Sequence, residues 1–213
     1  MLEIRSRTAD GRDGELRGVV FGYAMHPTCT QDGTIHGDWC GWAQYYVEQA
    51  HKGCTAIFIQ GCGSDANPIP RFRPGLGQLY GQVLAYAVDD VLLQMQGSSS
   101  WLHGPLRCGL DATTLPFDPL HFPTEQALQA LAAGGGEITA RQQRGARYQL
   151  EILARDGQLQ SGVSFPAQVW GFGPSASELV MVVLTGEVVS DYAVRLKEQH
   201  GWERTWVAAC EYP

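Results

Sequence analysis

The sequence predicts an α/β fold, with a mixed or mostly parallel sheet flanked by helices and an inserted helical pair. Apolar, β-branched runs at residues 16–25, 54–59 and 179–184 are typical of buried strands. Amphipathic stretches at residues 41–51 and 76–96 are typical of helices. Because strands and helices follow one another along the chain, we expect neighbouring strands to share one sheet.

The elements of the first half end at clear signals. The first strand stops at His26-Pro27, and Asp38 is placed to cap the first helix, which Gly53 ends. The second strand runs into a long Gly-rich loop, residues 61–74. One apolar face is expected on each helix: Trp42, Tyr45 and Tyr46 on the first, and Leu76, Leu79, Tyr80, Val83, Leu84, Val88, Val91, Leu92 and Met95 on the second.

The middle of the chain has a different character. Residues 106–115 resemble an edge or connecting strand, and Pro116, Pro119 and Pro123 then interrupt regular structure. Thr124 is expected to cap a helix, and a more charged helix follows over residues 138–154. We interpret residues 116–158 as a helical insertion on the outside of the core.

The last third returns to strands at residues 161–170, 179–184 and 205–209, with a helix beginning at or just after Glu187. The chain stops four residues after the last of these strands. We therefore interpret residues 1–213 as one catalytic-type domain that is incomplete.

Composition narrows the function. A net charge of −7 argues against broad nucleic-acid binding, which depends on Lys and Arg. No apolar stretch approaches the roughly 20 residues of a membrane span, and the N-terminus has no secretory apolar region. Six cysteines without a CxxC pair are expected to be buried or idle thiols, although an oxidising compartment would permit a disulfide.

His26 and Glu187 are candidate metal ligands. His26 ends a predicted buried strand, and imidazole is the commonest metal ligand; the alternative is a structural histidine. Glu187 lies at a strand-to-helix junction, where it is either a zinc-type carboxylate ligand or an ordinary acid at a helix N-terminus.

The Gly-rich loop carries the other candidates. Asp65 and Asn67 either form turns or help to stabilise an oxyanion, and Gly63 and Arg71 are placed to contact a substrate. A solvated Arg71 is the alternative for that residue. The loop matches neither of the common phosphate-binding glycine patterns.

Several motifs together resemble the neutral/alkaline non-lysosomal ceramidase family, in its N-terminal catalytic domain and bacterial ceramidase-like branch. They are Phe21-Gly-Tyr-Ala-Met-His-Pro-Thr28, Gly37-Asp38 with Gly41-Trp-Ala43, Ala56-Ile-Phe-Ile-Gln-Gly-Cys-Gly-Ser-Asp-Ala-Asn-Pro68 with the helix after it, and Leu184-Thr-Gly-Glu-Val188 with residues 192–197. The order and spacing of the motifs carry the resemblance.

The resemblance implies a zinc amidohydrolase that cleaves the amide of ceramide or a related N-acyl lipid by metal-activated water. It implies that His26, Glu187 and Tyr212 bind zinc. The family has a serine where this chain has Asn67, and a further zinc-ligand histidine in a segment upstream of His26 that nothing before Leu16 matches.

Two other functions stay open. One is a degenerate relative that binds a lipid-like or sugar-like ligand, and the other is a cytosolic protein that binds a phosphorylated metabolite. The expected partners are a small lipid-like substrate and a membrane surface, with no nucleic acid. An exported location would follow if the full-length protein carried a signal peptide.

Overall fold

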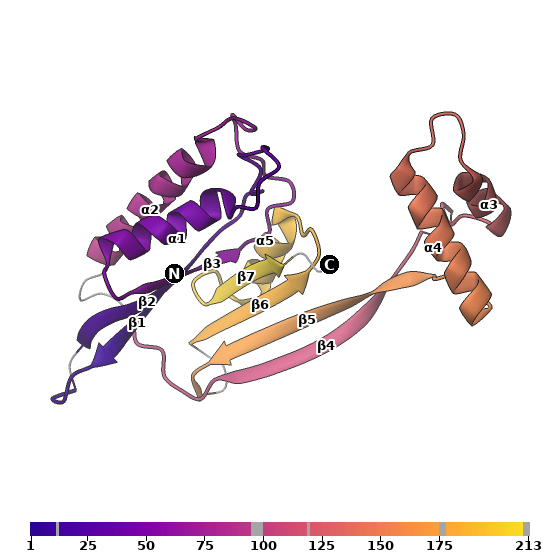
Figure 1. The fold of residues 1–213 in the computed structure, drawn as a ribbon. Coiled ribbons are helices and arrows are strands. Elements are labelled where there is room, and N and C mark those ends of the chain that lie inside the picture. Colours follow the sequence, from indigo (N-terminus) through magenta and orange to yellow (C-terminus); the bar gives the residue numbers. More distant parts are fainter. Residues whose placement is uncertain (12, 95–99, 119, 175–177, 211–213) are drawn as a thin grey trace. The chain divides into compact units, whose positions relative to one another are not determined.

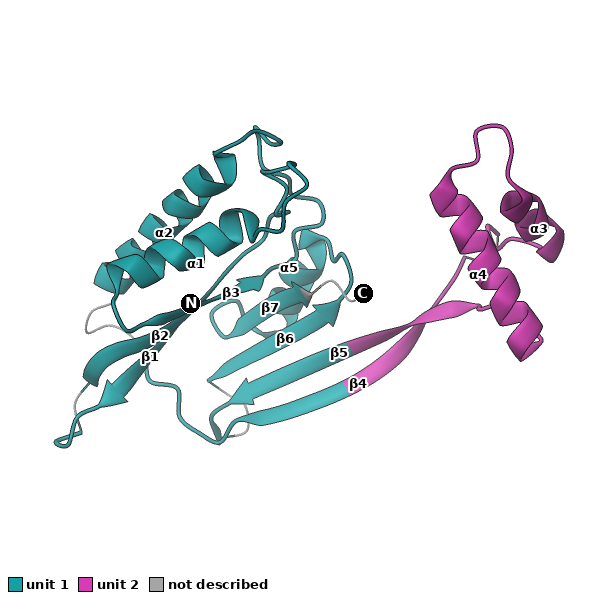
Figure 2. Ribbon diagram, viewed as in Figure 1, with its two compact units in different colours: residues 1–110, 167–213 teal, residues 111–166 magenta. Residues whose placement is uncertain are grey.

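The computed structural model describes residues 1–11, 13–94, 100–118, 120–174 and 178–210. The chain forms two compact units, one of Met1–Leu110 with Ala167–Pro213 and one of Asp111–Pro166 (Figure 2). The predicted α/β class is confirmed, because two sheets and five helices make up the described structure (Figure 1).

The first sheet has the order β1-β2-β3, built from Leu2–Arg7, Asp13–Tyr23 and Thr55–Gln60. β2 and β3 are parallel, as expected, and helix α1, Asp38–Ala50, lies between them in the chain. β1 pairs antiparallel with β2 and was not predicted. Its short run alternates Leu2 and Ile4 with charged residues and is an edge of the sheet, so it lacks the apolar run that marks the buried strands.

Helices α1 and α2, the latter Leu76–Gln94, pack through small residues rather than through the predicted stripes. A Cβ on Gly81 would lie 2.7 Å from the backbone oxygen of Trp39, so only glycine permits this approach. The predicted face of α2 is wrong at Leu79, Val83 and Val91, which are 52%, 59% and 40% exposed. On α1, Trp42 and Tyr45 are likewise exposed. The buried residues are Gly77, Gly81, Ala85, Val88 and Leu92 on α2, and Asp38, Trp39, Ala43 and Val47 on α1. Residues 95–96 of the predicted helix lie outside the described residues.

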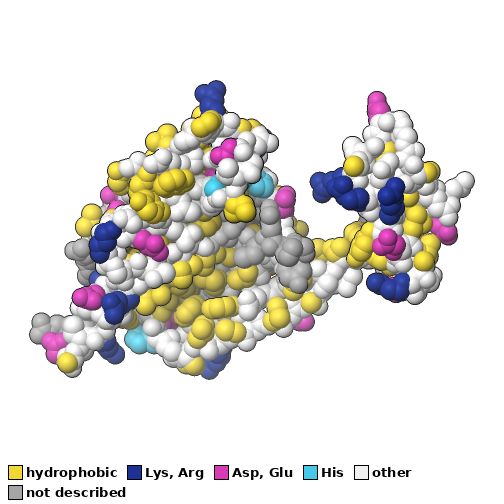
Figure 3. Space-filling model, viewed as in Figure 1, with side chains coloured by type: hydrophobic (Ala, Val, Ile, Leu, Met, Phe, Trp, Pro, Cys, Tyr) yellow, Lys and Arg dark blue, Asp and Glu magenta, His cyan; other side chains and the backbone are white. Residues whose placement is uncertain are grey.

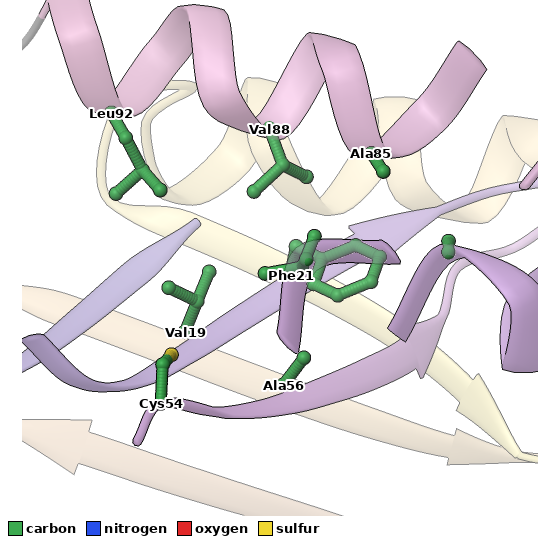
Figure 4. Packing of buried hydrophobic residues seen from close by; sticks show 9 residues of the cluster. Val19, Phe21, Cys54, Ala56, Ala85, Val88 and Leu92 are labelled. Carbon is green, nitrogen blue, oxygen red and sulfur yellow. The ribbon is translucent and has the colours of Figure 1, made fainter. Parts of the chain in front are cut away.

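The main core lies between the first sheet and these two helices (Figure 4). Val19 and Phe21 of β2 and Ala56 of β3 face Val88 and Leu92 of α2. Burial of each large side chain of this kind stabilises the fold by roughly 1.5–3 kcal/mol. The core therefore fixes where β2 and β3 end, and those ends carry the candidate site.

The second sheet has the order β4-β5-β6-β7, from Arg107–Pro116, Gly162–Phe172, Leu179–Thr185 and Thr205–Cys210. β5 and β6 are antiparallel, whereas β6 and β7 are parallel, with helix α5, Ser190–His200, between them in the chain. β4 is an edge strand, as predicted. A small core joins this part of the fold to the loop after β3, through Cys62, Val188, Val207 and Ala209.

The unit of Asp111–Pro166 contains the predicted helical pair, α3 at Glu125–Ala133 and α4 at Ala140–Asp156. Thr124 caps α3 as expected, because its side chain accepts a hydrogen bond from the backbone N–H of Ala127 at 3.2 Å. Thr139 and Gln142 form a reciprocal capping box at the start of α4. Pro119, one of the predicted breakers, lies outside the described residues.

Among the helices described, none combines the length and apolar character that crossing a bilayer requires.

Candidate functional site

The candidate site lies where β2 and β3 end side by side. The loop after β3 folds back against the end of β2, and the N–H of Gly61 donates to the carbonyl of Tyr23 at 2.9 Å. Gly63 is buried, and a Cβ there would lie 2.6 Å from backbone atoms of Ala24 and Met25. Because residue 63 is a glycine, the loop can lie close to the end of β2, just before His26.

His26 is held at three atoms. Its backbone N–H donates to Ala66 at 2.9 Å, its carbonyl accepts from the Trp39 indole at 3.1 Å, and its Nε2 lies 2.9 Å from the Ser64 carbonyl. Because a carbonyl can only accept, this last contact requires the proton on Nε2. Nδ1 of the neutral ring then keeps a lone pair, which is the arrangement of a metal-binding or basic imidazole.

Ser64 connects His26 to the start of α5. Its carbonyl faces the His26 ring, and its own N–H donates to the carbonyl of Val188 at 3.3 Å. Glu187, the residue before Val188, is exposed. One loop residue therefore joins the segments that carry the two predicted metal ligands, although no contact between the His26 and Glu187 side chains is seen.

Asp65 binds the N-terminus of α5. Its carboxylate accepts from the backbone N–H of Ser190 at 3.0 Å and from the Ser190 hydroxyl at 2.6 Å. These hydrogen bonds lower the pKa of Asp65 below its usual value. The bond from the Ser190 hydroxyl has the larger effect, and the bond from the backbone N–H adds to it. The observed contact is thus a cap on α5, which comes from a loop distant in the sequence. The predicted catalytic role of Asp65 stays a prediction.

Asn67 and Arg71 form a pair within the loop. The Arg71 guanidinium donates to Oδ1 of Asn67 and lies 4.5 Å from the centre of the Phe72 ring. The amide oxygen accepts this hydrogen bond, and the two N–H donors of Asn67 can bind a ligand. The structure thus gives Arg71 an orienting contact, and its predicted contact with substrate stays a prediction.

Asp38 is a site-supporting residue whose function the sequence did not indicate. It was expected to cap α1, but the cap position is Gly37 and Asp38 is the first helical residue, with a φ of 49°. Its buried carboxylate accepts from the N–H groups of Cys29, Thr30 and Trp39, at 3.3, 2.9 and 2.7 Å. The capping expectation is therefore wrong: the left-handed backbone turns the carboxylate onto the loop that follows His26.

The cysteines near this loop are not activated. Burial, with the Asp38 carboxylate as a second cause, raises the pKa of Cys29 to about 12, and the same two causes raise that of Cys40 to about 12. Thiols of such high pKa are poor nucleophiles near neutral pH. Cys54, Cys62 and Cys108 are free thiols as well.

The residues present fit a zinc ion only in part. His26 and Glu187 have the right donor chemistry, but catalytic zinc usually takes three protein ligands. Within the described ranges, no cluster of three or more His, Cys, Asp or Glu side chains is placed to hold a metal. Tyr212, the third predicted ligand, lies outside the described residues, so its contribution stays a prediction.

A cavity of about 340 Å³ lies beside the loop. Its walls come from the end of β2, from α1, from α2 and from the loop, and include Tyr23, Met25, Trp39, Asn67, Tyr80 and Val83. Figure 3 shows hydrophobic side chains gathered over the region of α1 and α2. No pattern in the sequence indicates this cavity, although its α2 wall belongs to the predicted apolar face of that helix.

Comparison with known proteins supports the fold. No family model matches the chain, and no curated protein matches it at the significance required. A solved structure described as "Ceramidase complexed with C2" matches with a TM-score of 0.57 and 15% sequence identity. The match covers 98% of this chain and 41% of that chain, so the present chain spans about two fifths of that protein's length. The chain has a ceramidase-like fold.

Proposed function

We propose that the site where β2 and β3 end hydrolyses the amide bond of ceramide or a related N-acyl lipid, with zinc held by His26 and Glu187. One observation carries the proposal: Ser64 bonds the His26 ring through its carbonyl and the backbone of Val188 through its N–H. The segments that carry a potential imidazole ligand and a strand-end carboxylate are therefore both hydrogen-bonded to one loop, which also carries an amide donor at Asn67. The ceramidase-like fold gives independent support.

The chain's own residues suit this chemistry. Ser64 fixes the proton of His26 on Nε2 and leaves Nδ1 as the donor atom. Asn67, oriented by Arg71, offers N–H groups to a carbonyl oxygen whose negative charge grows during attack. When bound, zinc would supply a water of lowered pKa and would polarise the carbonyl.

Binding without catalysis is a second candidate function. The apolar cavity beside the loop favours it, because such a cavity can hold a lipid-like ligand whether or not a metal is present. The phosphorylated metabolite is less favoured, since none of the described residues that line the cavity carries a charge that could pair with a phosphate.

Metal content and amide cleavage, measured together, test the proposal. The 213-residue chain is stripped with a chelator, reconstituted with zinc, and assayed for bound metal and for release of the amine from an N-acyl amide. We expect His26→Ala and Glu187→Gln to lose both zinc and hydrolysis. Because Glu187 is exposed, Glu187→Gln should melt within about 1–2 °C of the unmodified chain.

Matched controls come from α5. His200 and Glu198 are exposed residues of the same types, and His200→Ala and Glu198→Gln should change neither readout. If the reconstituted chain cleaves the amide and His26→Ala and Glu187→Gln leave cleavage intact, the assignment of the site is wrong. A large loss of stability in Glu187→Gln would instead favour the interpretation of Glu187 as an ordinary acid at the helix start.

A further inference from the structure

The cavity beside the loop is apolar, and most of its polar atoms are already bonded. The Trp39 indole N–H donates to the His26 carbonyl at 3.1 Å, and the Tyr80 hydroxyl donates to the Pro70 carbonyl at 3.0 Å. Among the described residues that line the cavity, none carries a charge. A group buried here must therefore be uncharged and largely apolar, because an unpaired charge in such surroundings is strongly disfavoured.

Two polar side-chain groups of the described lining can bind a ligand, the amide of Asn67 and the hydroxyl of Tyr23. The Asn67 oxygen accepts from Arg71, and its amide nitrogen carries two N–H groups that can donate to an occupant. An occupant with an acceptor, such as a carbonyl oxygen, at its end near Asn67 can take this hydrogen bond. An uncharged acyl group has both properties: an apolar body and a carbonyl.

The cavity volume limits the size of that acyl group. A dry cavity of roughly 150 Å³ holds one benzene molecule. The cavity here, about 340 Å³, has a little more than twice that volume. On the same packing it holds on the order of a dozen carbon atoms, which excludes the complete burial of a long fatty acyl chain.

The cavity and the candidate site share Trp39. This residue is 1% exposed, lines the cavity, and holds the His26 carbonyl through its indole. Met25, the neighbour of His26, also lines the cavity. An acyl group in the cavity thus has its carbonyl beside Asn67 on the loop that binds His26.

We propose that this cavity is an acyl-binding site selective for compact, medium-length acyl groups whose carbonyl accepts a hydrogen bond from Asn67. Hydrolysis of the bound amide rests on the proposed function. The acyl site adds the substrate class: neutral amides of medium-length acids, rather than of long-chain acids.

Binding of an amide series tests the proposal apart from catalysis. The full chain, freed of metal by a chelator, is titrated with N-acetyl-, N-octanoyl- and N-hexadecanoyl-ethanolamine below their aggregation limits. Calorimetry and tryptophan fluorescence follow binding, since Trp39 lies in the wall. Each buried methylene contributes roughly fourfold to affinity, so N-octanoyl should bind at least about tenfold more tightly than N-acetyl. N-hexadecanoyl should gain nothing over N-octanoyl.

Two matched substitutions on α2 locate the site. Val83 lines the cavity and is 59% exposed, whereas Val91, 40% exposed, is on the same helix away from the cavity. We expect Val83→Trp to weaken N-octanoyl binding at least about tenfold and Val91→Trp to leave it unchanged. Asn67→Ala should weaken all three amides by a similar factor, because they share the carbonyl.

Contrary results are distinct. Tighter binding of N-hexadecanoyl than of N-octanoyl, or equal effects of Val83→Trp and Val91→Trp, would overturn the acyl site. So would a failure of all three amides to bind. Selective binding in a chain that takes up no zinc and cleaves nothing would support the acyl site and contradict the proposed hydrolysis. Cleavage without preference for medium-length amides would do the reverse.

Discussion

Replacement of Gly63 by alanine should displace the loop that holds His26. The added Cβ would lie 2.6 Å from the Ala24 carbonyl carbon and the Met25 nitrogen, whereas carbon atoms in good contact are about 3.5–4.0 Å apart. The loop and strand end must therefore separate by roughly an ångström. Overpacking of this kind costs about 2 kcal/mol, which corresponds to a fall of about 4–8 °C in Tm for a domain of this size.

Thermal unfolding followed by circular dichroism measures this fall, with Gly41→Ala as the matched control. Gly41 lies inside α1, and a Cβ there would meet no atom within 4 Å. Alanine should therefore stabilise the helix by roughly 0.5–1 kcal/mol and leave or raise Tm. If Gly63→Ala melts within about 1 °C of the unmodified chain, the close approach of loop and strand is wrong.

Three further predictions concern single polar residues. Because the folded-state pKa of Asp65 is depressed, its hydrogen bonds to Ser190 stabilise the fold above about pH 4 and are lost as the pH falls through the folded-state pKa. The difference in Tm between the unmodified chain and Asp65→Asn should thus be constant near neutral pH and vanish in acid; a difference that grows in acid would contradict this sign. Asp38→Asn should lower the free energy of unfolding by about 3 kcal/mol in urea titrations, because one acceptor oxygen is replaced by a donor facing backbone N–H groups. Thr139→Ala should destabilise α4 by about 1 kcal/mol through loss of the capping box, seen as faster hydrogen exchange in its first turns; unchanged exchange would show that the cap is not needed.

Much of the fold could be predicted because the apolar periods are strong. The runs at residues 54–59 and 179–184 became β3 and β6, and Thr124 caps α3 as predicted. The buried faces of α1 and α2 could not be predicted in the same way. A search for hydrophobic periodicity assigns the largest apolar side chains to the buried face. The two helices instead meet at Gly77, Gly81 and Ala43, where small residues let the backbones approach each other.

The sequence suggests residue positions for the candidate site, but it could not predict the contacts between them. His26 and Glu187 stand out because each follows a strand. The hydrogen bonds that connect their segments join residues far apart in the sequence. Ser64 is 38 residues from its partner His26, and Asp65 is 125 residues from its partner Ser190. No local pattern encodes pairs so far apart in the chain. Asp38 shows the same limit, since its residue type suits a cap and only the left-handed backbone redirects it.

Asn67 carries the clearest consequence for chemistry. The ceramidase family that the motifs resemble has a serine at this place, and an amide is not a nucleophile. In this chain the Asn67 oxygen accepts from Arg71, and the amide nitrogen can donate hydrogen bonds. Residue 67 is therefore suited to stabilise a charged oxygen and not to attack a carbonyl. Under the proposed function the nucleophile is a water, and the proposed metal ligands His26 and Glu187 are the groups on which hydrolysis would depend.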